Sequence, residues 1–223
     1  MTFRLFLEAI AKFAAGVVLV GGLIFLPAGT LTFPNGWLLM GLMFIPMFIA
    51  GIIMMVKNPL LLKKRLNGRE KLESQGLVIK LSGLMFALGF LAAGLGYRLH
   101  WPAFPPPVVS AAIPFFLIAY LLYGEVLREN AYLSRTIEVQ EGQRVVDTGL
   151  YALVRHPMYA ATLILFLSIP LILGSPCSLL IFLAYPFFLV RRLKDEETLL
   201  EKELPGYRAY QQKVRWRLIP FLW

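Results

Sequence analysis

The chain has 223 residues, of which 58% are hydrophobic, and a formal net charge of +9. Its mean hydropathy of +0.70, with apolar residues in long runs, excludes an ordinary soluble domain and predicts an integral membrane protein. A nucleic-acid-binding role would need a folded basic domain, and the sequence contains none.

The first charge-free stretch predicts two transmembrane helices. It runs from Phe13 to Val56 and is punctuated by turn-forming residues at 27–30 and 34–36. A helix needs about 20 residues to cross the hydrocarbon core, so the stretch has room for two spans. We place them near 8–27 and 37–56, and we expect the first to be retained rather than cleaved as a signal peptide.

Two further spans and a helical hairpin are predicted downstream. The third span covers Leu81 to Tyr97, and the fourth begins after the prolines at 105–107 and ends near Tyr123. The uncharged run 157–190 contains Gly174-Ser175-Pro176, which favours a turn over a helix. Its arms of about 17 and 14 residues would be roughly 25 and 21 Å long, slightly short of the hydrocarbon core. The expected fold is all-α, with about four transmembrane helices and a C-terminal transmembrane hairpin.

The positions of lysine and arginine predict the orientation of these spans. Most of them are Arg4 itself or lie in the loop 57–71, in the segment 128–155 and in the tail from Arg191. This topology places all of these segments on one side of the membrane. Only Arg98 lies in an opposite loop. By the positive-inside rule, both termini face the cytoplasm.

The segments predicted on that side are short. Pro59 favours the start of a helix that lies in the membrane interface, and β-branched residues around a Glu-Gly turn predict a hairpin loop over 137–149. Residues 195–204 favour a helix, 205–206 end it, and an amphipathic piece follows over 207–217. We expect this loop and tail to fold over the same membrane face and form a pocket.

Arg155-His156-Pro157-Met158-Tyr159 is the first candidate for chemistry. Pro157 is well placed as the first residue of a helix, so His156 would lie at its N-cap, where free backbone N–H groups favour an anion. Tyr159 would then offer a hydroxyl and a ring face that suits a cationic ligand. The alternative is that Arg155 and His156 cap a helix at the interface and Tyr159 belongs to an aromatic belt.

A second charged cluster follows the hairpin. Two arginine–carboxylate pairs with helical spacing account for most of it: Arg191 with Asp195, and Arg192 with Glu196. Glu197 has no such partner, because position 193 is Leu193. Glu125 lies near the end of the fourth span and has Arg128 three residues away on the same helical face. The single cysteine, Cys177, has no cysteine or histidine at metal-ligand spacing, so no metal site is expected.

The order of these motifs resembles the isoprenylcysteine carboxyl methyltransferase family, within a wider group of membrane methyltransferases that includes phospholipid N-methyltransferases. The resemblance covers roughly 120–223. The motifs that carry it are Gly124-Glu125 with Leu127-Arg128, Gly149-Leu150-Tyr151, Arg155-His156-Pro157-Met158-Tyr159, and Glu196-Glu197 with Leu199, followed by Tyr207, Tyr210 and Pro220. We expect one domain over 1–223, with N-terminal spans in 1–123 and the motif-bearing region in 124–223.

Membership of that family would imply S-adenosylmethionine as the methyl donor, bound outside any Rossmann domain. The chain has no Gly-x-Gly-x-x-Gly motif, in agreement with this. By resemblance, the residues assigned to the cofactor are Tyr151, Arg155, His156, Tyr159 and Glu196. Those assigned to catalysis on the acceptor side are Arg128, Arg192 and Glu197.

The acceptor is expected to be lipophilic and to enter from the membrane, and several functions remain open. A prenylcysteine-like carboxylate would need no general base, whereas a lipid amine would need one, such as Glu197 or Glu125. A path between helices could be lined by Phe115, Phe116, Phe166, Phe182, Phe187 and Phe188, although such residues are commonly packing residues. Two different functions also fit the sequence: a sterol-type membrane reductase that binds a nicotinamide dinucleotide, and a non-catalytic protein that binds anionic lipids through Lys63, Lys64 and Arg65.

Overall fold

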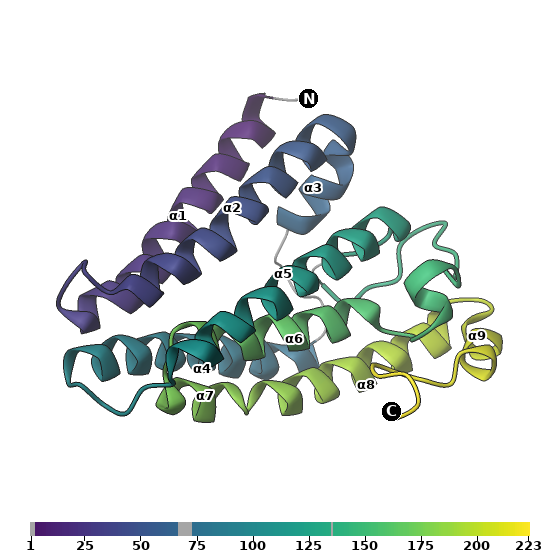
Figure 1. The fold of residues 1–223 in the computed structure, drawn as a ribbon. Helices are drawn as coiled ribbons and strands as arrows, with labels where there is room; N and C mark the ends of the chain where they lie inside the picture. The colour runs from purple at the N-terminus through teal and green to yellow at the C-terminus, as the bar shows by residue number, and fades with distance from the viewer. Residues whose placement is uncertain (1–2, 67–72, 135) are drawn as a thin grey trace.

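The structure, a computed structural model, describes residues 3–66, 73–134 and 136–223 (Figure 1). Across these residues it consists of helices joined by loops and turns, and it contains no β-strand. The predicted all-α class is confirmed. Residues 67–71 of the predicted basic loop, and residue 135 of the segment 128–155, lie outside the described residues.

The helices follow the predicted order. They are α1 (Phe3–Ala28), α2 (Pro34–Lys57), α3 (Pro59–Leu66), α4 (Glu73–Arg98), α5 (Pro106–Glu129), the 3-10 turn η1 (Gly149–Ala152), α6 (Pro157–Ile172), α7 (Pro176–Phe182), α8 (Tyr185–Glu203) and α9 (Tyr207–Lys213). Prolines 34, 59, 106, 157 and 176 each stand at a helix start, where their missing N–H costs no hydrogen bond.

Five segments of the described chain are long and apolar enough to cross a membrane. They are most of α1, all of α2, most of α4, all of α5, and the segment Pro176–Glu203 that joins α7 and α8. The apolar helix α6 has 16 residues and is shorter. The chain is therefore an integral, multi-pass membrane protein, as predicted.

The second arm of the hairpin differs from the prediction. The uncharged run ends at residue 190 and residues 195–204 are predicted to be helical, and α8 joins the two without a break from Tyr185 to Glu203. An interruption lies earlier, at Leu183 and Ala184, because Pro186 has no N–H to donate to the carbonyl of Phe182. The charged residues of α8 are thus held rigidly by a helix that begins inside the apolar bundle.

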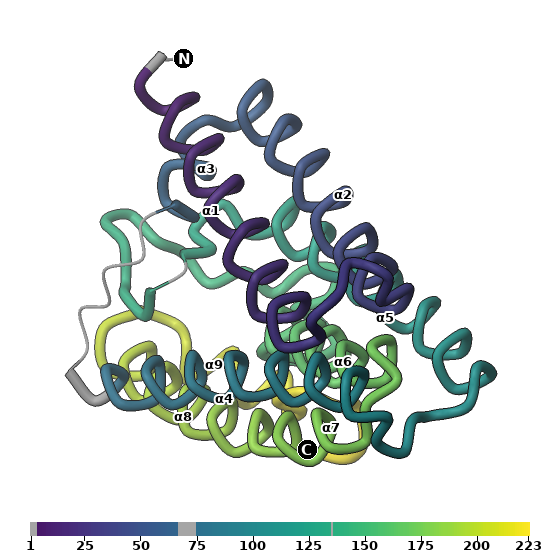
Figure 2. Tube along the Cα trace, turned by 90° about the vertical axis from the view of Figure 1, so that its left-hand side faces the viewer, coloured from purple at the N-terminus to yellow at the C-terminus, as the bar shows by residue number. Residues whose placement is uncertain are grey.

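The helices pack in two groups. The hairpin of α1 and α2 leans across the group formed by α4 to α8, and α1 contacts α4 (Figures 1 and 2). Within the second group α5 packs along α6, and α4 packs against α7 and α8. The main core is aliphatic and aromatic, with Ile24, Leu39, Phe116, Ile172 and Phe182 fully buried.

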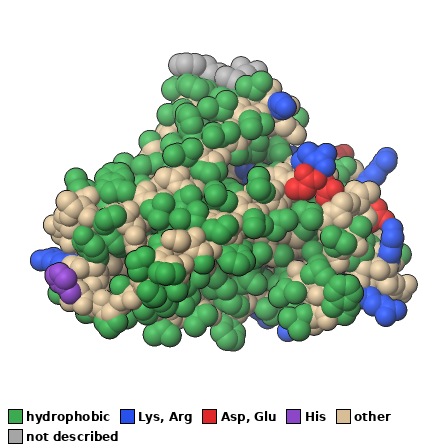
Figure 3. Space-filling view, in the orientation of Figure 1, with side chains coloured by type: hydrophobic (Ala, Val, Ile, Leu, Met, Phe, Trp, Pro, Cys, Tyr) green, Lys and Arg blue, Asp and Glu red, His purple; other side chains and the backbone are tan. Residues whose placement is uncertain are grey.

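Charged side chains gather at one end of this bundle. Most of the visible surface is apolar, and acidic and basic residues cluster beside the end of α5 and over α9 (Figure 3). The predicted interfacial helix begins at Pro59 as α3, and the predicted Glu-Gly turn is present with Gly142 at a φ of +70°. Residues 137–149 nevertheless form no strand. Gly206, with a φ of +85°, separates α8 from α9 as expected.

Candidate functional site

The turn before α6 places two polar side chains, those of Arg155 and His156, at the charged end of the bundle. His156 is the N-cap of α6 and Pro157 its first residue, as predicted, which fixes where the His156 ring points. The turn is anchored by the C-terminal tail, because the backbone N–H groups of Arg155 and His156 donate to the carbonyls of Trp216 and Arg217 at 2.8 and 2.9 Å. The tail therefore forms part of the site.

Glu197 of α8 lies at the centre of a buried ion cluster. Its Oε1 is 3.1 Å from Arg155 Nε and 3.2 Å from His156 Nε2, and its Oε2 accepts a hydrogen bond from Arg217 Nε at 2.9 Å. The Glu197 side chain is only 6% exposed, so its carboxylate has lost most of its hydration. The contacts with its three partners compensate for the cost of burying the negative charge. The cluster ties α8, the α6 turn and the tail together.

Tyr159 forms a second link between α6 and α8. Its ring stacks on that of His156, with centroids 5.6 Å apart and planes 20° apart, and its hydroxyl donates a hydrogen bond to Glu196. On α8, Arg192 Nη1 lies 3.4 Å from the Oε1 of buried Gln75 in α4. The predicted pair of Arg191 and Asp195 is present at 3.5 Å.

Tyr151 holds the loop after α5 against α9. Its hydroxyl accepts a hydrogen bond from Asn130 Nδ2 at 2.9 Å, and its carbonyl accepts one from the Tyr210 hydroxyl at 2.7 Å. Burial raises the pKa of the Tyr151 hydroxyl, and burial likewise raises the pKa of Tyr207 and of Tyr210.

These raised pKa values predict a loss of stability at alkaline pH. A hydroxyl whose pKa is higher in the folded state favours folding fully below its unfolded pKa of about 10, and that contribution falls as the pH rises above it. We expect the free energy of unfolding to fall by about 1.4 kcal/mol per pH unit for each such tyrosine that stays protonated in the folded protein. Thermal unfolding between pH 8 and 11 measures the slope, and Tyr207→Phe should make it shallower. An unchanged slope in that variant would contradict the assignment to Tyr207.

A polar pocket lies between these elements and the loop 130–146. It encloses about 90 Å³ of free space. Six of the eight predicted site residues line it: Tyr151, Arg155, His156, Tyr159, Arg192 and Glu196. Tyr207 also lines it, and among the described residues the Tyr207 hydroxyl and Arg155 Nε are buried atoms without a hydrogen-bond partner. Arg155 Nε lies 3.1 Å from Glu197 but is not directed into a hydrogen bond with it.

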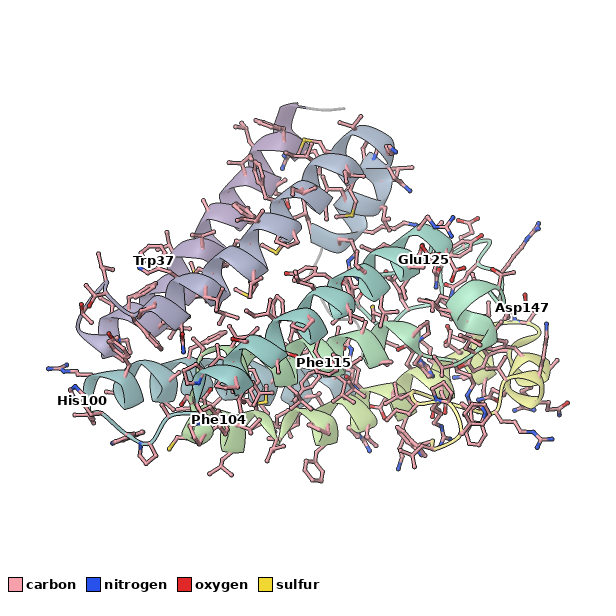
Figure 4. The ribbon with its side chains drawn as sticks, in the orientation of Figure 1. Trp37, His100, Phe104, Phe115, Glu125 and Asp147 are labelled. Carbon is pink, nitrogen blue, oxygen red and sulfur yellow. The ribbon has the colours of Figure 1, made fainter. Side chains whose placement is uncertain are left out.

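The other two predicted residues lie elsewhere. Glu197 sits behind the pocket wall, where it orients Arg155 and His156. Arg128 is 73% exposed at the end of α5 and pairs with Glu125 at 2.5 Å, so the structure does not bring it to the cluster. Figure 4 labels its partner Glu125 near the end of α5. Sequence reasoning did not identify Arg217 or Gln75 as part of the site. Each is far along the chain from its partner, Glu197 for Arg217 and Arg192 for Gln75. Tyr207 was noted only as part of a motif.

A second, apolar cavity of about 490 Å³ lies between the α1–α2 hairpin and helices α5 and α6. On α6 it reaches Thr162, one helical turn from Tyr159 in the polar pocket, and Thr162 Oγ1 donates to the Tyr159 carbonyl. Leu127 and Met158 pack against the same small core near this junction. We call this space the acceptor cavity below, after the lipophilic acceptor that the sequence leads us to expect between the helices.

The predicted aromatic path is only partly present. Phe116 and Phe166 line the acceptor cavity, but Phe182 is a core residue, and Phe115 and Phe187 are exposed on the apolar surface. Phe188 packs against the main core.

The basic residues of α3 make contacts within the protein. Lys64 Nζ donates to Gln140 Oε1 at 2.6 Å, and Arg65 Nη1 donates to the Ser134 carbonyl at 3.1 Å. Arg65 also lies over the Tyr123 ring and lines the acceptor cavity. Because Ser134 lines the polar pocket, α3 connects the acceptor cavity to the loop that covers the pocket.

Fold and site together define a helical, multi-pass membrane protein with a polar site at one end of its bundle. Residues 111–202 match the profile of the isoprenylcysteine carboxyl methyltransferase family. The predicted resemblance to that family is therefore confirmed over this part of the chain. The matched region begins before residue 120 and ends before the tail motifs.

Known relatives agree with this. Protein-S-isoprenylcysteine O-methyltransferase B of Arabidopsis thaliana is 28% identical over 179 residues, which cover 75% of this chain and 88% of the relative. The protein-S-isoprenylcysteine O-methyltransferase of Dictyostelium discoideum is 26% identical over 161 residues, 68% of this chain and 67% of the relative. A Delta(14)-sterol reductase of Mus musculus is 30% identical over 95 residues, only 40% of this chain and 22% of that protein.

A solved structure shows the same fold. It is that of the eukaryotic intramembrane Ras methyltransferase, an isoprenylcysteine carboxyl methyltransferase, with a TM-score of 0.57 and 21% sequence identity. The similarity covers 96% of this chain and 77% of the other.

Proposed function

We propose that the protein transfers a methyl group from S-adenosylmethionine to the carboxylate of a lipophilic, prenylcysteine-like acceptor at the membrane boundary. The observation that carries this proposal is the position of the polar pocket one helical turn from a large apolar cavity. A water-soluble donor and a lipid acceptor could meet there. By the positive-inside rule, the charged end with both termini faces the cytoplasm.

The residues of the polar pocket fit the donor. The donor has an amino-acid carboxylate, ribose hydroxyls, an adenine ring and a sulfonium. The Tyr207 hydroxyl is a buried donor without a hydrogen-bond partner, and Arg155 adds a positive charge to the same pocket; both suit the donor's carboxylate, and the start of α6 favours an anion nearby. Glu196 is an acceptor for hydroxyl groups, and the Tyr159 ring suits a cation. When bound, the donor supplies an electrophilic methyl group on a positively charged sulfur.

The carboxylates of the site support a carboxylate acceptor over an amine. Transfer to a carboxylate forms an ester C–O bond, breaks the C–S bond and moves no proton. An amine acceptor needs a base, but each of these carboxylates is already engaged. Glu197 has three cationic or hydrogen-bonding partners, Glu196 accepts from Tyr159, Glu138 accepts from Ser134 and Thr136, and Glu125 pairs with Arg128. The chain's contribution is to hold both substrates and exclude water, with Arg192 proposed to bind the acceptor carboxylate.

A transfer assay with tritiated donor tests this function. The purified protein would be given S-farnesylcysteine with a free carboxylate, the same compound as its amide, or phosphatidylethanolamine. We expect label only with the free carboxylate, and we expect mild alkali to release that label as methanol, as an ester must. Label that resists alkali would indicate N-methylation, and no label with any acceptor would refute the proposal.

The shared segment with a sterol reductase makes reduction with a nicotinamide dinucleotide the second candidate. If reduction were the function, NADPH should displace S-adenosylhomocysteine from the purified protein. We expect no competition at millimolar NADPH.

Filling the acceptor cavity is expected to weaken binding of the acceptor. Gly51 of α2 borders it and has no atom within 4 Å of where a Cβ would lie, so Gly51→Leu should fold and fill part of the cavity. We expect KM for a farnesylated acceptor to rise about tenfold, the effect of losing roughly 1.4 kcal/mol of apolar burial, with little change for the donor.

The matched control is Gly83→Leu in α4, an exposed position with equally open space. It should leave both KM values unchanged. Equal effects of the two substitutions would show that the acceptor does not use the cavity.

A further inference from the structure

A third cavity lies at the other end of the bundle, away from the charged cluster. It has a volume of about 740 Å³, opens to the surface, and is bordered by the α1–α2 loop, the α4–α5 loop and the α6–α7 turn. Figure 4 shows the two ends, with His100 and Asp147 at opposite extremes of the molecule. Nothing in the proposed methyl transfer uses this space.

The charge of this cavity is positive and uncompensated. Arg98 and His100 both line it, and a basic side chain lies beside the histidine at the tip of the bundle (Figure 3). None of its lining residues is acidic, and the loops 29–33, 99–105 and 173–175 contain no aspartate or glutamate. Arg98 is also the cation that departs from the predicted positive-inside pattern. Because the positive-inside rule does not account for an arginine on this side of the membrane, its presence needs another explanation.

The backbone holds His100 in an unfavourable conformation. The end of α4 has two hydrogen bonds of a Schellman motif, from Trp101 N–H to the Gly96 carbonyl at 2.9 Å and from His100 N–H to the Tyr97 carbonyl at 3.4 Å. His100 therefore occupies the left-handed position of that motif, with a φ of +55°, where glycine is the usual residue. A side chain kept where glycine would be more stable indicates a use for its imidazole.

The remaining walls combine hydroxyl groups with apolar rings. Thr30 and Thr32 hydroxyls are 2.8 Å apart at the rim, and the Tyr97 hydroxyl donates to the Thr32 carbonyl. Phe33 stacks on Tyr97, with centroids 4.3 Å apart, and Trp101 forms another wall. Tyrosine and tryptophan in such positions are typical of the level at which lipid headgroups lie.

We propose that this cavity binds the phosphate headgroup of an anionic phospholipid. The Arg98 guanidinium and the His100 ring hold the phosphate oxygens, the threonine hydroxyls contact the polar remainder of the headgroup, and the aromatic walls pack against the first methylenes of the acyl chains. The cavity is far larger than one phosphate ion, and its walls are partly apolar, which favours a lipid over free phosphate.

A binding experiment on the full-length protein tests this. The protein in a neutral detergent would be titrated with dioctanoyl phosphatidylglycerol, with inorganic phosphate at matched ionic strength in a second arm. Native mass spectrometry would count bound lipid, and the shift in apparent Tm would report affinity. We expect saturable binding of one lipid at this site, and no saturable shift with phosphate alone.

Three variants make the assignment specific. Arg98→Gln should weaken lipid binding about tenfold, the effect of losing a charge-assisted hydrogen bond. His100→Gly should weaken it at least threefold without lowering the Tm of the lipid-free protein, because glycine suits the left-handed position. Lys80→Gln removes the same charge from an exposed site in the first half of α4 and should change nothing.

The outcomes separate clearly. Unchanged lipid affinity in both Arg98→Gln and His100→Gly would overturn the proposal, as would saturation by inorganic phosphate with the same affinity as the lipid. Methyl transfer should persist in both variants, so the proposed activity and this lipid site can each fail without the other.

Discussion

Glu197→Gln is expected to abolish most of the methyl transfer and to destabilise the protein strongly. The substitution preserves size but removes the charge that Arg155, His156 and Arg217 share. Arg155 and Glu197 are at most 9% exposed, so the Arg155 guanidinium would be buried without a counter-charge. Breaking a buried ion pair in this way costs about 3–5 kcal/mol.

The expected loss of activity arises because Glu197 positions other residues, and not because Glu197 contacts the substrates. Glu197 holds Arg155 and His156 from behind the pocket, so its removal frees both to move away from the donor. We expect kcat/KM to fall at least about a hundredfold, since a misplacement of about 1 Å has such an effect. Glu201→Gln, one turn further along α8 and exposed, is the matched control and should retain activity. A Glu197→Gln protein that folds and methylates normally would refute the role of the cluster.

Arg217→Gln is expected to have the second largest effect. Arg217 donates to Glu197 Oε2 at 2.9 Å and lies over the Trp223 ring, with its guanidinium carbon 5.4 Å from the ring centroid. At 34% exposed it is partly solvated, so we expect a loss of about 1.5–2 kcal/mol, within the range for a hydrogen bond to a charged group. Donor KM should rise about tenfold or more, because the tail also fixes the α6 turn.

Thermal unfolding and donor titration measure the two effects separately. Arg215→Gln is the control, because Arg215 is exposed two residues earlier in the same tail. If both substitutions change donor affinity equally, the effect comes from the loss of one positive charge in the tail and not from the loss of the contact with Glu197.

The fold was largely predictable because membrane helices depend on local composition. Charge-free runs indicated α1, α2, α4 and α5, and prolines marked the starts of α2 and α5. The start of α4 was predicted at Leu81, but the helix begins at Glu73 because it continues through the charged residue Lys80. The interruption at Leu183 and Ala184 was missed because Gly174-Ser175-Pro176 was the stronger turn signal in the same run. The continuation of α8 beyond the uncharged run agrees with the helical spacing of Arg191 and Asp195.

The site was predictable to the extent that its residues are close in the sequence. The motif 155–159 implied a helix N-cap, and local spacing correctly paired Arg191 with Asp195. Local spacing also left Glu197 without a partner, and its three partners come from positions 155, 156 and 217. Pairing over such long separations depends on tertiary packing, which one sequence does not reveal. Arg128 was expected near the acceptor, but its nearest carboxylate is three residues away in its own helix.

A structure of the protein with S-adenosylhomocysteine and a farnesylcysteine analogue bound together would test the central claim most directly. We expect the nucleoside product to bind among Arg155, Tyr159, Glu196 and Tyr207, with the prenyl chain in the acceptor cavity between the α1–α2 hairpin and α5–α6. A donor product bound outside the polar pocket, or a prenyl chain held on another face of the bundle, would contradict it.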